Sequence, residues 1–151
     1  MKDQSAEKQL AGFIAKYTPE IGVLARAALA KMRARLPGAL ELVWDNYNAL
    51  AIGFGPTERA SDVIFSIVVY PRWVSLFFFH AADLPDPRKL LKGSKEIRHI
   101  VLDDAATLDK PAVRALMAQA LKRLTNSLDA TKPVRIVIKS ISAKQRPRRP
   151  A

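Results

Sequence analysis

The fold class is decided by residues 63–79, which read VIFSIVVYPRWVSLFFF. Two runs rich in β-branched and aromatic residues, Val63–Tyr70 and Trp73–Phe79, flank the dipeptide Pro71-Arg72. Such runs favour strands, and a proline between them favours a tight turn. Both runs are far shorter than the roughly 20 residues that span a bilayer. The sequence therefore predicts a β-hairpin in the middle of the chain.

Further strands are expected on both sides of this hairpin. The runs with strand composition are Leu40–Trp44, Ala49–Phe54, Ile97–Leu102 and Val134–Ile138. Residues 55–59 have loop composition, and residues 83–93 predict a proline-rich connection with one helical turn near residues 88–91. The sequence thus predicts a sheet of five to six strands.

Helical patterns lie outside this central region. Ser5 can cap a first helix, and Thr18-Pro19-Glu20 is a strong start signal for a second, which Pro37-Gly38 ends. A third helix is expected at residues 111–127, with an apolar face made of Val113, Leu116, Met117, Ala120, Leu121 and Leu124. Because helices flank a run of strands, we predict an α+β fold, an antiparallel sheet with helices packed on one face.

Charge divides the chain into two parts. The 151 residues carry a net charge of +11, and seven bases without an acid lie between positions 132 and 151. We expect a single domain at residues 1–139 and a disordered basic tail at residues 140–151. The tail bases Lys144, Arg146, Arg148 and Arg149 could bind nucleic acid weakly and without sequence preference. The alternative is a solubilising end that has no partner.

Several classes of chemistry are excluded or lack support. The chain has no cysteine, which excludes disulfides and zinc-thiolate sites and fits a cytoplasmic location. No membrane association is expected, since no apolar stretch is long enough. His80 and His99 show no metal-ligand spacing, and no nucleophile motif is present. We therefore expect no metal, no cofactor and no catalytic residues; whether the protein is an enzyme stays open, with a non-enzymatic role favoured.

The most suggestive cluster is aromatic and polar. Trp44, Tyr47 and Asn48 could wall a ligand pocket between two strands, although such residues also form ordinary turns. Arg98 or His99 could add positive charge, and only one of the two can face the pocket because neighbours on a strand point to opposite sides. We predict that Tyr47, Asn48 and Arg98 converge on one ligand.

Several motifs in order resemble the YdhG-like domains of unknown function. They are Trp44-Asp45-Asn46-Tyr47-Asn48-Ala49-Leu50, Pro71-Arg72-Trp73-Val74, Leu84-Pro85-Asp86-Pro87, Leu90-Leu91-Lys92-Gly93-Ser94 and Arg98-His99-Ile100. The resemblance spans roughly positions 20–125, and it implies a small bacterial α+β domain. Some relatives are described as frataxin-like iron chaperones, a role expected to need an acidic surface that this mildly basic domain lacks.

Three functions stay open. The first is a non-enzymatic domain that binds a small polar or anionic ligand. The second is a nucleic-acid-associated protein that acts through the basic tail. The third is an iron-handling chaperone, which rests on the family resemblance. Sequence alone does not define the oligomeric state.

Overall fold

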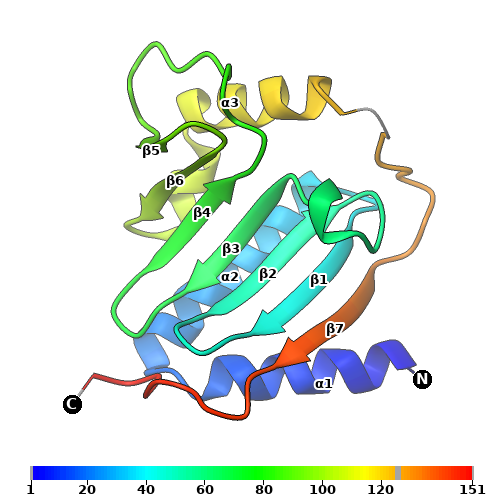
Figure 1. The fold of residues 1–151 in the computed structure, drawn as a ribbon, viewed down its shortest axis with the longest axis vertical. Coiled ribbons are helices and arrows are strands. Elements are labelled where there is room, and N and C mark those ends of the chain that lie inside the picture. The colour runs from blue at the N-terminus through cyan, green and yellow to red at the C-terminus, as the bar shows by residue number, and fades with distance from the viewer. Residues whose placement is uncertain (1, 125–126, 151) are drawn as a thin grey trace.

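The computed structural model describes residues 2–124 and 127–150 (Figure 1). Along these residues two α-helices come first, six strands follow, and a third α-helix precedes the last strand. Their bounds are α1 Lys2–Ala15, α2 Pro19–Arg35, β1 Leu40–Asp45, β2 Leu50–Gly55, η1 Ala60–Asp62, β3 Phe65–Val69, β4 Val74–Phe78, β5 Lys92–Ser94, β6 Ile97–Leu102, η2 Ala105–Asp109, α3 Pro111–Lys122 and β7 Arg135–Ile141.

The strands form one sheet in the order β5-β6-β4-β3-β2-β1-β7. All neighbours are antiparallel except β1 and β7, which run parallel. The α+β class is confirmed, and within the described residues the sheet has seven strands rather than five or six. The additional strand is β5, which begins at the end of the proline-rich connection expected at residues 83–93 and pairs with β6. The predicted hairpin is confirmed as β3 and β4, closed by a hydrogen bond from Tyr70 N to Trp73 O at 2.9 Å.

Side chains that alternate along the central strands separate two faces of the sheet. On β3, Phe65, Ile67 and Val69 are fully buried and join the hydrophobic core, while Val68 points to the other face and is half-buried. Leu29 and other residues of the helices also belong to the core. Figure 1 shows α2 behind the sheet, with α1 and α3 near its two ends. One face of the sheet thus builds the core, and the opposite face looks out of the page.

The ends of the helices agree with their sequence signals. Thr18 caps α2, because its hydroxyl accepts a hydrogen bond from Ile21 N at 3.4 Å. After α2 the chain turns at Gly38 with a φ of +86°, and a Cβ there would lie 1.9 Å from Asp129 O. The structure ends α3 at Lys122, earlier than the expected residue 127, and residues 125–126 lie outside the described part.

Tyr17 connects the end of α1 to the sheet. Its buried hydroxyl donates a hydrogen bond to Val69 O at 2.7 Å and accepts one from Leu50 N at 3.1 Å. Burial raises the pKa of this phenol to about 12. The hydroxyl therefore stays protonated at any ordinary pH and satisfies a backbone group on each of two strands.

We expect Tyr17→Phe to lower the free energy of unfolding by about 1–3 kcal/mol, because the substitution leaves a buried donor and a buried acceptor without this partner. The matched control is Tyr47→Phe, which removes the same atom from an exposed side chain and should change stability by less than about 0.5 kcal/mol. Urea denaturation measures both variants. Equal stability of the two would contradict the structural role of Tyr17.

Candidate ligand-binding groove

The C-terminal segment folds back onto the sheet. Strand β7 continues to Ile141, past the expected boundary at residue 139. Ser142 N then donates to Asp45 O and Arg146 N donates to Tyr47 O, each at 2.9 Å. Figure 1 shows this segment beside the turn between β1 and β2. The segment that the sequence predicts to be disordered is thus held against the domain along residues 142–150.

A buried ion cluster anchors this segment. The guanidinium of Arg148, whose side chain is 3% exposed, lies 2.9 Å from the buried carboxylate of Asp45. Lys16 contacts the other carboxylate oxygen at 2.8 Å. Arg148 also donates to the backbone oxygens of Asn46 and Tyr47. Arg148, which the sequence suggests as a nucleic-acid contact, is therefore an internal anchor whose charge is neutralised.

The same ion cluster makes the free energy of unfolding depend on pH. Burial by itself would raise the pKa of Asp45, but side-chain hydrogen bonds from Lys16, Gln145 and Arg148 outweigh it and hold the pKa below its ordinary 3.8. The unfolded chain consequently takes up this proton first as the pH falls. The stabilisation is complete above about pH 5 and is lost as the pH falls through 3.8 towards the folded-state pKa.

We therefore expect the free energy of unfolding to fall between pH 5 and pH 3, and Asp45→Asn to remove part of this dependence. Urea titrations at each pH compare the two proteins. An Asp45→Asn protein with the same slope against pH as the wild type would show that Asp45 does not titrate as described.

Three segments that are distant in sequence line an open groove of about 990 Å³ at this end of the sheet. The β1–β2 turn contributes Tyr47 and Asn48, the β3–β4 turn contributes Tyr70, Arg72 and Trp73, and the C-terminal segment contributes its exposed arginines. The full lining is Tyr47, Asn48, Tyr70, Pro71, Arg72, Trp73, Arg146, Pro147, Arg149 and Pro150. The groove thus depends on the anchored C-terminal segment for one wall.

Flat rings and positive charge alternate in the groove. Tyr70 and Trp73 stack with centroids 4.6 Å apart, and the guanidinium of Arg146 lies 5.8 Å from the centre of the Tyr47 ring. Tyr47 and Trp73 are 46% and 42% exposed. Arg72, Arg146 and Arg149 form no ion pair within the described residues, and no acidic side chain lines the groove. This arrangement suits an anion that carries a planar group.

The structure brings only part of the predicted site together. Tyr47 and Asn48 lie in the groove. Arg98 pairs in register with Phe78 on β4, at the opposite end of the strands, where it donates to Ala82 O. Strands β3 and β4 separate β6 from β2, so Arg98 and Tyr47 do not converge.

The two remaining candidates, Trp44 and His99, lie on the face of the sheet opposite the core, which we call the outer face. His99 stacks on Phe77 with centroids 5.0 Å apart, and Trp44 faces the same side from β1. The sequence interpretation missed Tyr70, Arg72 and Trp73 as groove residues. The available signal was their position around the predicted hairpin turn, where two aromatic residues bracket an arginine.

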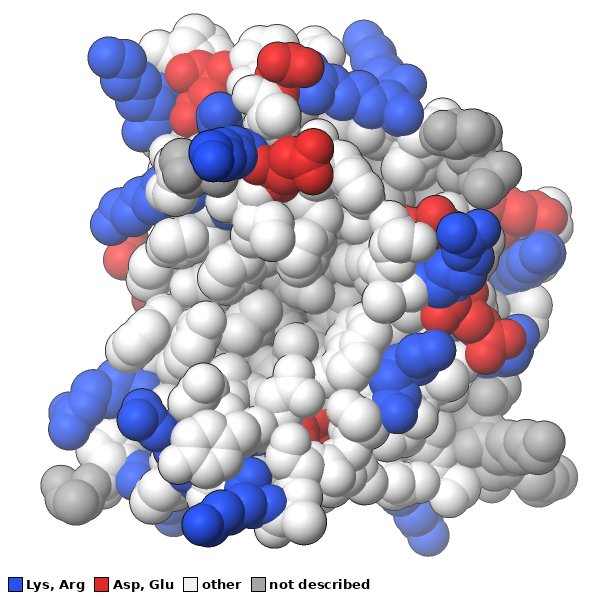
Figure 2. Space-filling model, in the orientation of Figure 1, with Lys and Arg blue, Asp and Glu red and all other residues white. Residues whose placement is uncertain are grey.

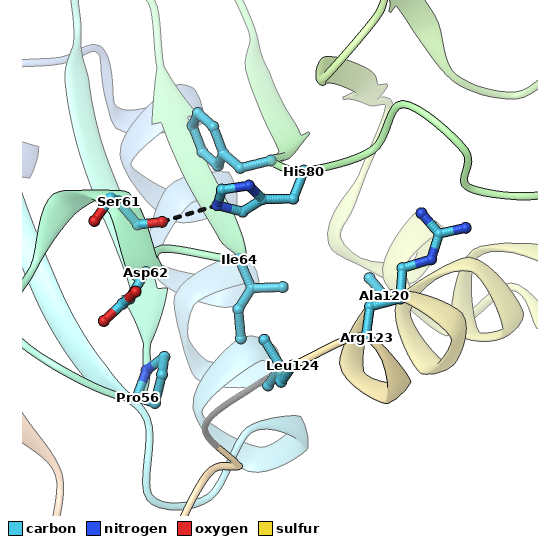
Figure 3. Close-up of a pocket in the computed structure, with 9 residues that line it drawn as sticks. Pro56, Ser61, Asp62, Ile64, His80, Ala120, Arg123 and Leu124 are labelled. Carbon is cyan, nitrogen blue, oxygen red and sulfur yellow. Dashed lines mark hydrogen bonds between the residues drawn. The ribbon is translucent and has the colours of Figure 1, made fainter.

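A second, smaller pocket of about 280 Å³ surrounds His80 (Figure 3). The imidazole Nε2 lies 2.8 Å from Ser61 O, and the carboxylate of Asp62 accepts a hydrogen bond from Thr57 instead of His80. Arg123, on the far side, donates to Asp83 O. Histidine and acid therefore form no acid–base pair here. In the described part of the chain, no three side chains of the metal-binding types gather.

Comparisons with known proteins add no relative. Neither a scan of family models nor searches of curated proteins and solved structures give a significant match. The resemblance to YdhG-like domains stays a prediction. Among the described residues, no helix has the length and apolar character needed to cross a membrane.

Proposed function

We propose that this protein is a non-enzymatic binding domain whose groove takes a small ligand with a negative group and a planar ring. The observation that carries the proposal is the gathering, around two exposed aromatic side chains, of three arginines that have no carboxylate partner among the described residues. Arg72 and Arg146 would bind the anion by charge-assisted hydrogen bonds. Trp73 or Tyr47 would stack on the ring, and the Asn48 amide would bond a polar substituent.

Adenosine monophosphate (AMP) and benzoate are suitable probes, since both combine a ring with an anion. We expect AMP to bind, and Arg72→Ala or Arg146→Ala to weaken binding about tenfold, the loss of one charge-assisted hydrogen bond. Lys144→Ala is the control, because it removes one charge from the same segment without touching the groove. Calorimetry that gives equal affinity for all four proteins, or for AMP and adenosine, would contradict the proposal.

Single-stranded nucleic acid is a second candidate, favoured by the exposed aromatic rings beside Arg146 and Arg149. Bases stack on such rings while arginines contact phosphates. A thymidine oligomer should then bind more tightly than duplex DNA of equal length, and Trp73→Ala should remove the difference. Equal binding of both forms would leave only a general attraction to phosphate.

Iron handling has less support than ligand or nucleic-acid binding, because it rests on the family resemblance alone. We also propose a bacterial cytoplasmic origin, for which the lack of cysteine and the same resemblance are the arguments.

A further inference from the structure

The outer face of the sheet is mostly apolar where a solvent-facing sheet is ordinarily polar. Outward positions of β1, β2, β3, β4 and β6 carry the half-buried side chains of Trp44, Ala51, Val68, Phe77 and Val101. Two serines on the same face, Ser66 and Ser75, are buried. Antiparallel sheets with one wet face usually place polar residues outward. Figure 2 shows a hollow of uncharged side chains in the middle of this face, with charged side chains around its margin. A contiguous apolar surface of this kind marks a binding surface.

The hollow has a volume of about 400 Å³, and none of the described residues that line it is charged. It extends from Trp44 and Tyr70 to Phe79 and Ile97. Gly53 lies beneath the Trp44 ring, and a Cβ there would stand 3.2 Å from the indole. The missing side chain leaves room against β2 for the indole and for the Val63 side chain, whose nearest methyl would lie 3.1 Å from that Cβ.

Tyr70 lines both this hollow and the arginine groove, so the two lie next to each other. At one end stand Arg72 and Arg146, and at the other stands Ile97. Strand β4, which runs between the two ends, covers about 17 Å at the usual rise per residue. Positive charge at one end of a long apolar floor complements an amphipathic anion.

We propose that, besides anions with a planar ring, the groove and the hollow together bind an amphipathic anion such as a long-chain carboxylate. Its carboxylate pairs with Arg72 and Arg146, and its chain follows the hollow towards Ile97. This inference rests on the proposed function of the groove. A second copy of the chain fits the face less well, because two proteins of net charge +11 repel one another.

The test uses dodecanoate below its micelle-forming concentration and the Trp73→Phe protein, whose only tryptophan is Trp44. The Trp44 emission should shift to shorter wavelength on binding. Affinity should rise from hexanoate to dodecanoate by about fourfold for each added methylene, because every methylene is transferred from water to the hollow. Dodecyltrimethylammonium, with the same chain and the opposite charge, should bind at least tenfold more weakly.

Two variants locate the ends of the ligand. Arg72→Ala should weaken dodecanoate about tenfold. Ile97→Ser, at a side chain that is 53% exposed, should weaken dodecanoate about threefold or more and leave hexanoate unchanged. An unchanged melting temperature verifies that each variant is folded.

Affinity independent of chain length, with AMP or benzoate still bound, would overturn this inference and leave the proposed function standing. Equal affinity for the cationic amphiphile would also overturn it, since the arginines would then play no part. Sedimentation that shows a dimer dissociated by Ile97→Ser would identify a second copy as the occupant instead. Failure of all anions to bind would remove the proposed function itself.

Discussion

Replacing Leu116 with aspartate is expected to lower the free energy of unfolding by about 4 kcal/mol or more. Leu116 is buried on α3 and belongs to the hydrophobic core together with Val113 and Met117. The substitution removes a large apolar side chain and buries a carboxylate that has no partner, and both effects destabilise the folded state. A loss of this size should lower the melting temperature by about 10 °C or more.

The matched control is Gln119→Asp, which places the same side chain on the exposed side of the same helix. Its effect should stay within about 0.5 kcal/mol. Calorimetry or circular dichroism on heating measures both. Equal melting temperatures for the two variants would show that α3 does not contribute to the core as described.

Arg148→Ala should lower the free energy of unfolding by about 3 kcal/mol, because it leaves Asp45 buried with one partner fewer. Lys16 still contacts Asp45, which keeps the loss at the lower end of the range for a broken buried ion pair. The variant should also release the C-terminal segment, so that trypsin cleaves it faster. The groove would lose a wall, and binding of AMP should weaken with it.

Lys144→Ala is again the control, since it removes the same charge from the same segment at an exposed position. It should leave both stability and proteolysis unchanged. Equal stability of the two variants would mean that Arg148 does not anchor the segment. Truncation after Lys139, which the charge distribution suggests as a test of the tail, would also remove Arg148 and would thus affect folding as well as binding.

Most of the fold could be predicted because its signals are local. The proline between two apolar runs specifies the β3–β4 hairpin, and Thr18-Pro19 specifies the start of α2. The ordered conformation of the C-terminal segment could not be predicted, because it depends on the contact between Arg148 and Asp45, which are 103 residues apart in the sequence. Locally the segment offers only bases and prolines, the composition of a disordered tail.

The residues of the candidate site could likewise be predicted only in part from the sequence. Tyr47 and Asn48 could be singled out from their polar and aromatic neighbours. Arg98 could not be placed, because its position relative to Tyr47 depends on the pairing of β6 with β4 and on the two strands between β6 and β2. Arg146 lies in the groove because Arg148 contacts Asp45 and Arg146 N donates to Tyr47 O. No spacing in the sequence reveals these long-range contacts.

The central claim is that an anion with a planar ring binds between Trp73 and the groove arginines. The chain has two tryptophans, Trp44 in the hollow and Trp73 in the groove, so a ¹H–¹⁵N NMR spectrum should give one indole signal for each. Titration with AMP should shift the Trp73 signal and leave that of Trp44 in place, and Arg146→Ala should weaken the response. A titration that moves neither signal, or Trp44 alone, would contradict the claim.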